Sequence, residues 1–174
     1  AWNQQVILDQ VHEFSSVPGG IFFLGGDSAI AVNKHGKRLY DEKFVYNERT
    51  RTHLTWSATE AEYTNLYQFM IFDDHAIESG GMMMPAPGSN FPSYIIKAET
   101  RAELATAIHE RLDSLSEKIG SFKLGDNFVA SLDETIARFN GFAEAGKDED
   151  FHRGEAPIDS HFHGPHDNNH MHPI

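Results

Sequence analysis

Two capped amphipathic segments in the second half of the chain constrain its fold most strongly. Thr100 precedes Glu103 by three residues, and Ser131 precedes Glu134 by the same spacing, which is typical of a capping box at a helix N-terminus. Apolar residues three and four positions apart follow each pair and would share one helix face. The sequence therefore predicts two helices, starting after Thr100 and after Ser131, and the second ends at Gly146.

Short apolar runs elsewhere predict strands. The runs of strand length that turn residues interrupt are residues 21–24, 28–33, 68–72 and 93–98. Residues 33–36 end in glycine and predict a tight turn, from which residues 37–40 return antiparallel. Strands combined with separate helices indicate an α+β fold with a small mixed or antiparallel sheet and packed helices.

The composition excludes several classes of partner. The 174 residues hold 14 Lys and Arg against 26 Asp and Glu, a net charge of -12 that repels nucleic acid and anionic membranes. No cysteine is present, and no apolar run is long enough to cross a bilayer. We expect one compact, cytoplasmic domain that binds no nucleic acid and has no membrane span. Because the chain does not begin with Met, it could be cut from a longer protein.

The end of the chain is rich in histidine. Five of these residues lie in the last segment: His161, His163, His166, His170 and His172. Imidazole suits zinc, copper and nickel, but the spacing lacks a regular ligand pattern. We therefore predict a solvated polar tail over residues 161–174 and no metal site.

A loop rich in glycine and proline spans residues 80–92 and contains Met82, Met83 and Met84. Flexible thioethers adapt to irregular shapes, so these side chains either line an apolar ligand surface or fill gaps in the core. The chain has no glycine-rich dinucleotide loop, phosphate loop, nucleophile elbow or His-Glu-x-x-His motif. The residues therefore indicate no autonomous active site.

Three stretches carry a family resemblance. Residues 33–42, Asn-Lys-His-Gly-Lys-Arg-Leu-Tyr-Asp-Glu, resemble the Asn-x-x-Gly-x-Arg-Phe-x-Asn-Glu pattern of FAD-dependent fumarate reductase, succinate dehydrogenase and 3-ketosteroid dehydrogenase flavoproteins. Residues 69–73 are similar to an apolar strand of that superfamily. Residues 132–154, with Thr-Ile-Ala-Arg-Phe-Asn and Gly-Lys-Asp-Glu-Asp-Phe-His-Arg-Gly, are similar to its helix and exit loop. Their order along the chain makes coincidence an unsatisfactory explanation.

The resemblance implies a cap domain, residues 1–160, inserted into a split FAD-binding domain, with residues 161–174 leading back toward it. FAD would be held mainly by that other domain of the full-length chain, so we expect the isolated segment to be inactive. The expected substrate is a small molecule, first a hydrophobic ketone and second a dicarboxylate, that gains or loses hydrogen across a carbon–carbon bond beside a carbonyl. A stand-alone binding module without catalysis is the rival interpretation.

The resemblance also implies site residues. Tyr46 matches the tyrosine of an Asn-Glu-x-x-Pro-Tyr stretch and would be the catalytic acid or base, or would simply pack in the cap. Asp41 stands where the family has Asn. Glu42 and Arg49 are predicted to contact the substrate, as are the three methionines of the loop. From spacing alone, Arg38 and Glu42 would form a surface ion pair.

Overall fold

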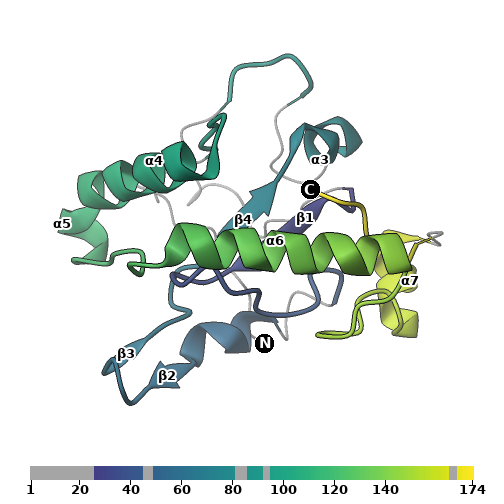
Figure 1. Ribbon diagram of the computed structural model, residues 1–174, viewed down its shortest axis with the longest axis horizontal. Coiled ribbons are helices and arrows are strands. Elements are labelled where there is room, and N and C mark those ends of the chain that lie inside the picture. The colour runs from purple at the N-terminus through teal and green to yellow at the C-terminus, as the bar shows by residue number, and fades with distance from the viewer. Residues whose placement is uncertain (1–25, 45–48, 81–85, 92–94, 165–167) are drawn as a thin grey trace.

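The computed structural model describes residues 26–44, 49–80, 86–91, 95–164 and 168–174. Strand β1 (Ala29–Val32) pairs antiparallel with β4 (Phe69–Phe72), with Ala29 opposite Phe72. Helix α6 (Phe128–Ala145) lies across this pair, and α4 (Arg101–Ser114) packs beside α6 (Figure 1). The described residues form five α-helices and two small antiparallel sheets, which confirms the predicted α+β class.

The remaining elements are short. They are the 3-10 helix η1 (Thr50–Leu54), strands β2 (Trp56–Ser57) and β3 (Glu62–Tyr63), and helices α3 (Asp74–Ser79), α5 (Ser116–Ile119) and α7 (Pro157–His163). β2 and β3 form a second antiparallel pair, which projects away from α4 (Figure 1). None of the described helices has the length and hydropathy needed to cross a bilayer.

One hydrophobic core joins the larger sheet to both long helices. Its fully buried members include Ile30 and Val32 of β1 and Leu132 and Phe139 of α6. Side chains at this spacing on α6 form one apolar face, as the sequence predicts. The core therefore holds α6 firmly against β1, the strand that borders the candidate site.

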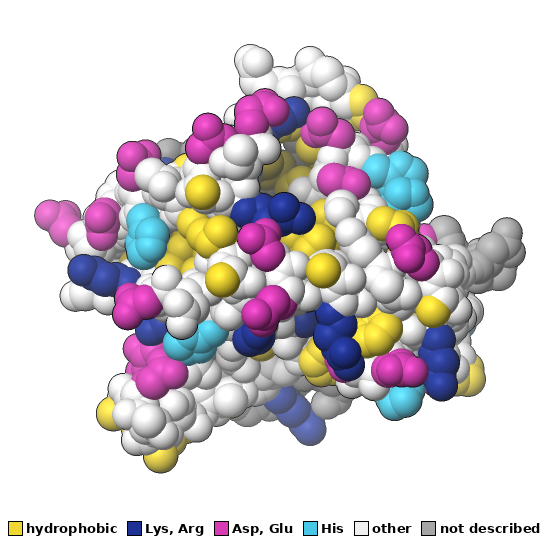
Figure 2. All heavy atoms as spheres, viewed as in Figure 1, with side chains coloured by type: hydrophobic (Ala, Val, Ile, Leu, Met, Phe, Trp, Pro, Cys, Tyr) yellow, Lys and Arg dark blue, Asp and Glu magenta, His cyan; other side chains and the backbone are white. Residues whose placement is uncertain are grey.

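On the face seen in Figure 2, acidic side chains are spread over the surface rather than gathered in one patch.

The helix predictions are confirmed at two of the three ends that the sequence predicted. Thr100 caps α4 in a capping box with Glu103, and Gly146, in the left-handed conformation, ends α6. The predicted start after Ser131 is wrong, because α6 begins four residues earlier, at Phe128, and Asn127 is its N-cap. Phe128 explains the difference: it is an apolar residue of the first turn that packs into the core and extends the buried face.

The strand predictions are confirmed for β1 and β4 and wrong for residues 37–40 and for the described residues 95–98. Gly36 turns the chain with φ of 71°, but the returning residues make only a single bridge, from Arg38 to Val32. A following strand does not form because Asp41 and Glu42 turn inward to bind polar partners. Residues 95–98 form no strand, and the apolar run 21–24 lies outside the described residues.

The predicted solvated tail is wrong in part, although His161, Asn168 and His172 are exposed. His170 and Met171 are buried, and Ile174 packs against the core. The tail lies so close to Gly154 that a Cβ there would come within 2.4 Å of the carbonyl oxygen of Asn169. Residues 168–174 thus pack against the loop that follows α6, although their polar composition suggested exposure.

Candidate functional site

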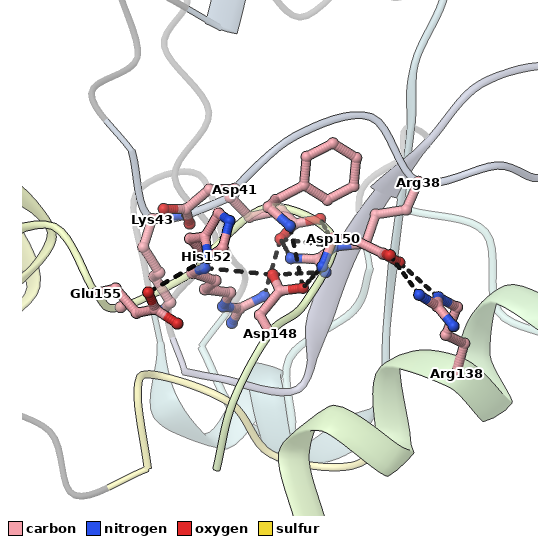
Figure 3. A network of polar contacts seen from close by, with 12 residues as sticks. Arg38, Asp41, Lys43, Arg138, Asp148, Asp150, His152 and Glu155 are labelled. Atoms are coloured by element: carbon pink, nitrogen blue, oxygen red, sulfur yellow. Dashed lines mark hydrogen bonds and ion pairs between the residues drawn. The ribbon is translucent and has the colours of Figure 1, made fainter. Parts of the chain in front are cut away.

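Four charged side chains, Arg38, Glu42, Asp148 and Arg153, form a buried ion-pair network between β1 and the loop after α6 (Figure 3). The Glu42 carboxylate accepts hydrogen bonds from Arg38 Nη2 at 2.7 Å and from Arg153 Nη1 at 3.0 Å. Asp148 lies 2.8 Å from Arg38 Nη1. The network therefore joins two of the stretches that carry the family resemblance, which are more than a hundred residues apart in sequence.

Arg153 also ties the network to the sheet. It is fully buried, and its guanidinium donates to the backbone carbonyls of Ala29, at 2.7 Å, and Asp27, at 3.0 Å. Arg38 lies between the rings of Phe139 and Phe151, each about 5 Å from its guanidinium carbon. The predicted surface ion pair of Arg38 and Glu42 is therefore a buried one.

The electrostatics of Glu42 follow from these contacts. Burial by itself raises the pKa of the carboxyl, but the charge and hydrogen bonds of Arg38, together with Arg153, outweigh burial and lower the pKa below its usual value. Glu42 also accepts from the backbone N–H of Ala31 at 3.0 Å. The carboxylate is thus charged and fully occupied by protein donors.

A groove of about 530 Å³ opens beside the network and is the candidate ligand site. Its apolar lining consists mainly of Leu39, Phe44, Phe151 and Ala156, with the Tyr40 ring. Its polar lining consists of Asp41, Arg49, His152 and Glu155. Mostly apolar walls with a few polar groups are the usual composition of a small-molecule site.

Asp41 differs from the other charged groups near the groove. Its side chain is 8% exposed, and its Oδ1 accepts one hydrogen bond, 2.8 Å long, from the backbone N–H of Lys43. Burial, helped by the charges of Asp159 and Glu42, raises the pKa of Asp41 to about 7, although the hydrogen bond from the Lys43 N–H and the charge of Arg153 lower it. Asp41 is therefore poised to hold or release a proton near neutral pH.

Of the predicted site residues, the structure describes Glu42 and Arg49 but not Tyr46 or the three methionines. Tyr46 and Met82 to Met84 lie outside the described residues, so their roles stay predictions. Glu42 faces the ion-pair network. Arg49 lines the groove, is buried, and donates from Nη1 to the backbone carbonyl of Glu42 at 2.9 Å. Substrate contact by Glu42 or Arg49 also stays a prediction.

Sequence reasoning missed the importance of Asp41, Arg153 and Asp159. Asp159 is fully buried: its Oδ2 accepts from the backbone N–H groups of Gly154 and Ala156, and its Oδ1 has no hydrogen-bond partner. The one available signal for Asp41 was its replacement of an Asn in the family pattern. Asp159 had none, because it lies between the stretch that carries the family resemblance, which ends at Gly154, and the predicted tail.

The residues present do not fit FAD or a metal ion. A dinucleotide site needs a glycine-rich turn from a strand into a helix N-terminus, and the described strands are short antiparallel pairs that lack such a turn. No group of three or more potential metal ligands occurs among the residues that the structure describes. A flavin would therefore have to be held by other parts of a longer protein.

Comparison with known proteins identifies relatives of one kind. No protein-family model matches the chain. It is 34% identical over 137 residues to 4-oxocyclohexanecarboxylate 2-dehydrogenase of Sinomonas cyclohexanicum, covering 79% of this chain and 21% of that protein. It is also 34% identical over 146 residues to 3-oxosteroid 1-dehydrogenase of Mycolicibacterium smegmatis, and this match covers 79% of this chain and 22% of that protein. Fumarate reductase (cytochrome) of Shewanella frigidimarina is 29% identical over 151 residues, covering 85% and 22%.

A solved structure has the same fold. The crystal structure of 3-ketosteroid delta1-dehydrogenase from Sterolibacterium denitrificans matches with a TM-score of 0.53 and 20% identity, covering 87% of this chain and 26% of that one. The chain spans about a fifth of the length of the curated relatives that it matches. Together the matches define the class, the flavoprotein dehydrogenases and reductases. Within that class, the chain belongs to the superfamily of ketosteroid dehydrogenases and fumarate reductases and corresponds to one segment of it.

Proposed function

We propose that this chain is the substrate-covering domain of a longer FAD-dependent oxidoreductase that removes hydrogen from a carbon–carbon bond beside a ring ketone. The observation that carries the proposal is the pair of relatives at 34% identity, whose names both describe dehydrogenases of cyclic oxo compounds. FAD would act as the hydride acceptor when bound, and the described residues leave its binding to another domain. The chain's own part is to enclose and orient the ketone.

The groove supports this role by its composition. Leu39, Phe44 and Phe151 supply an apolar surface for a ring, and the polar groups beside them can fix the orientation of an oxygen substituent. Closing such a surface over a substrate excludes water, which strengthens every hydrogen bond to the reacting carbonyl. In this proposal Tyr46 is the acid or base, and Met82 to Met84 line the substrate surface.

A dicarboxylate is the second candidate substrate. The 29% identity to a fumarate reductase over 85% of the chain favours it, and Arg49 in the groove wall is a potential partner for a carboxylate. A bound dicarboxylate would also meet two acidic side chains of the groove, Asp41 and Glu155, neither of which is a favourable partner for a carboxylate. The apolar lining and these two side chains favour the ketone as the first candidate.

The test uses the longer protein that contains this segment. Its visible flavin absorbance would be recorded, then followed under anaerobic conditions after addition of a 3-ketosteroid, 4-oxocyclohexanecarboxylate or, after chemical reduction of the flavin, fumarate. Bleaching by either ketone supports the proposal, and Tyr46→Phe should then slow the bleaching with little change in ketone binding. Reoxidation by fumarate without bleaching by ketones supports the reductase candidate. A protein that cannot be loaded with flavin contradicts both.

A further inference from the structure

The buried acidic groups around the groove fall into two kinds. Asp27, Glu42 and Asp148 each lie within 3.0 Å of a lysine or arginine nitrogen, so their negative charges are compensated. Asp41 and Asp159 form no ion pair within the described parts of the chain, and both are at least nine-tenths buried. A buried carboxylate without a cation is strongly disfavoured, and the usual outcome is that the group takes up a proton.

Asp159 is the member of this pair that accepts more hydrogen bonds from the backbone. Its Oδ2 accepts from two backbone N–H groups, at 3.0 and 3.2 Å, and such hydrogen bonds favour the carboxylate form. Asp41 accepts only one backbone N–H and feels the charge of Asp159 as a repulsion. Burial and this repulsion both favour the protonated form of Asp41.

Asp41 lies where its proton could be donated to a ligand. Asp41 lines the groove, whereas Asp159 does not. Figure 3 shows Asp41, His152 and Glu155 on the side of the network away from Arg138, where the groove opens. A neutral carboxylic acid presents one O–H donor, while its charged form only accepts hydrogen bonds.

Resting on the proposed function, we propose that this groove binds a neutral ketone whose carbonyl oxygen accepts a hydrogen bond from the uncharged carboxylic acid of Asp41. No covalent bond is formed or broken in this contact, and the proton stays on Asp41 while the ketone is bound. The acid would polarise the carbonyl, which acidifies the adjacent C–H bonds, so Asp41 acts as an electrophilic binding residue and not as the base.

The charges around Asp41 favour a neutral ligand. The charged and titratable groups that lie on the groove or act on Asp41 are Glu42, Lys43, Arg49, His152, Arg153, Glu155, Asp159 and, through Lys43, His163. The two arginines are already engaged, Arg153 by Glu42 and Arg49 by the backbone carbonyl of Glu42. A ligand carboxylate beside Asp41 would raise the number of unpaired negative charges, whereas a ketone oxygen adds none.

The test uses two rings of similar size, cyclohexanone as the neutral ketone and cyclohexanecarboxylate as the anion. Their binding to the chain is followed from amide NMR shifts between pH 5 and 9. We expect cyclohexanone to shift the signals of Asp41 and Phe151 and to bind more weakly as the pH rises through neutrality. Asp41→Ala should weaken binding about tenfold at low pH. Asp41→Asn, whose amide can donate at every pH, should bind with no pH dependence.

Glu134→Gln is the matched control, because Glu134 is an exposed acidic side chain that does not line the groove, and this variant should retain the wild-type pH profile. Four results would each overturn the inference. They are wild-type binding that is independent of pH, equal binding by Asp41→Ala, a preference for the anion, and no binding of either ring. In the longer protein, flavin bleaching by a ketone with an unchanged pH profile in Asp41→Asn would also overturn it. A longer protein without flavin would instead contradict the proposed function and leave the NMR titration valid.

Discussion

Replacing Glu42 by Gln separates a structural role of this residue from its predicted contact with the substrate. Gln keeps the shape of the side chain but removes the charge on which Arg38 and Arg153 both depend. Its amide N–H₂ group must also face at least one guanidinium donor, because both carboxylate oxygens accept protein hydrogen bonds. Arg38 would then keep Asp148 as its carboxylate partner, whereas the guanidinium of Arg153 would be left with the backbone carbonyls of Ala29 and Asp27.

The expected loss in the free energy of unfolding follows from the burial of the charged side chains. The side chains of Arg38, Glu42 and Arg153 are all at most 6% exposed, and breaking a buried pair of this kind costs about 3–5 kcal/mol. With a urea m-value of roughly 2 kcal/mol/M, the unfolding midpoint should fall by on the order of 2 M. Glu134→Gln is the control, since its partner Lys37 is 54% exposed and the expected loss is below about 1 kcal/mol.

The assay is urea unfolding of the chain, followed by tryptophan fluorescence and circular dichroism. A double variant, Glu42→Gln with Arg153→Met, covers the case in which the single variant is too unstable to study. Removing both partners together should cost less than the sum of the single losses, because it leaves fewer unpaired buried charges. If Glu42→Gln proves as stable as Glu134→Gln, the network is not what holds the loop to the sheet, and substrate contact becomes the better role for Glu42.

Four further outcomes are expected. Thr100→Ala removes the capping box of α4 and should cost about 1 kcal/mol, seen as a lower melting temperature. Gly36→Ala should cost more than about 1 kcal/mol in urea unfolding, because φ is positive and a Cβ would meet the Phe128 carbonyl oxygen at 2.7 Å. Phe139→Ala should cost about 3–5 kcal/mol by leaving a core cavity; a smaller loss would show that the core collapses. Because the folded pKa of Asp41 is raised to about 7, the folded state binds a proton that the unfolded chain has released, so the free energy of unfolding should fall as the pH rises from about 4 to 7. Midpoints measured at both ends of that range should show a smaller fall in Asp41→Asn.

Local signals in the sequence were sufficient for the helices and for two strands. The Thr100 capping box and the end of α6 at Gly146 depend on neighbouring residues, so spacing and residue type predict them. The start of α6 was missed because Phe128 joins the helix through core packing that no local pattern encodes. The same limit applies to the residues after Gly36, which leave the sheet to reach polar partners far away in the sequence.

Burial of charge was the main property that the sequence did not predict. Arg38 and Glu42 are four residues apart, a spacing that suggests a solvated pair, yet Asp148 and Arg153 enclose them from a loop over a hundred residues later. A histidine-rich tail likewise suggested exposure, although His170 is buried. The family resemblance brought these stretches together as motifs, but only the fold shows that their charges neutralise one another.

The distinction between paired and unpaired buried acids links the fold to the proposed chemistry. The network compensates Glu42 and Asp148 with two arginines, so these four residues can hold the loop and the sheet together without exchanging protons. Asp41 lies next to Glu42 in the sequence but outside that compensation, at the wall of the groove. A side chain that titrates near neutral pH contributes little to a rigid scaffold, because its charge and its donor both change there. The same property is useful for recognising a carbonyl, and it makes the groove, rather than the network, the part of this domain in which substitutions should alter ligand choice while leaving the fold intact.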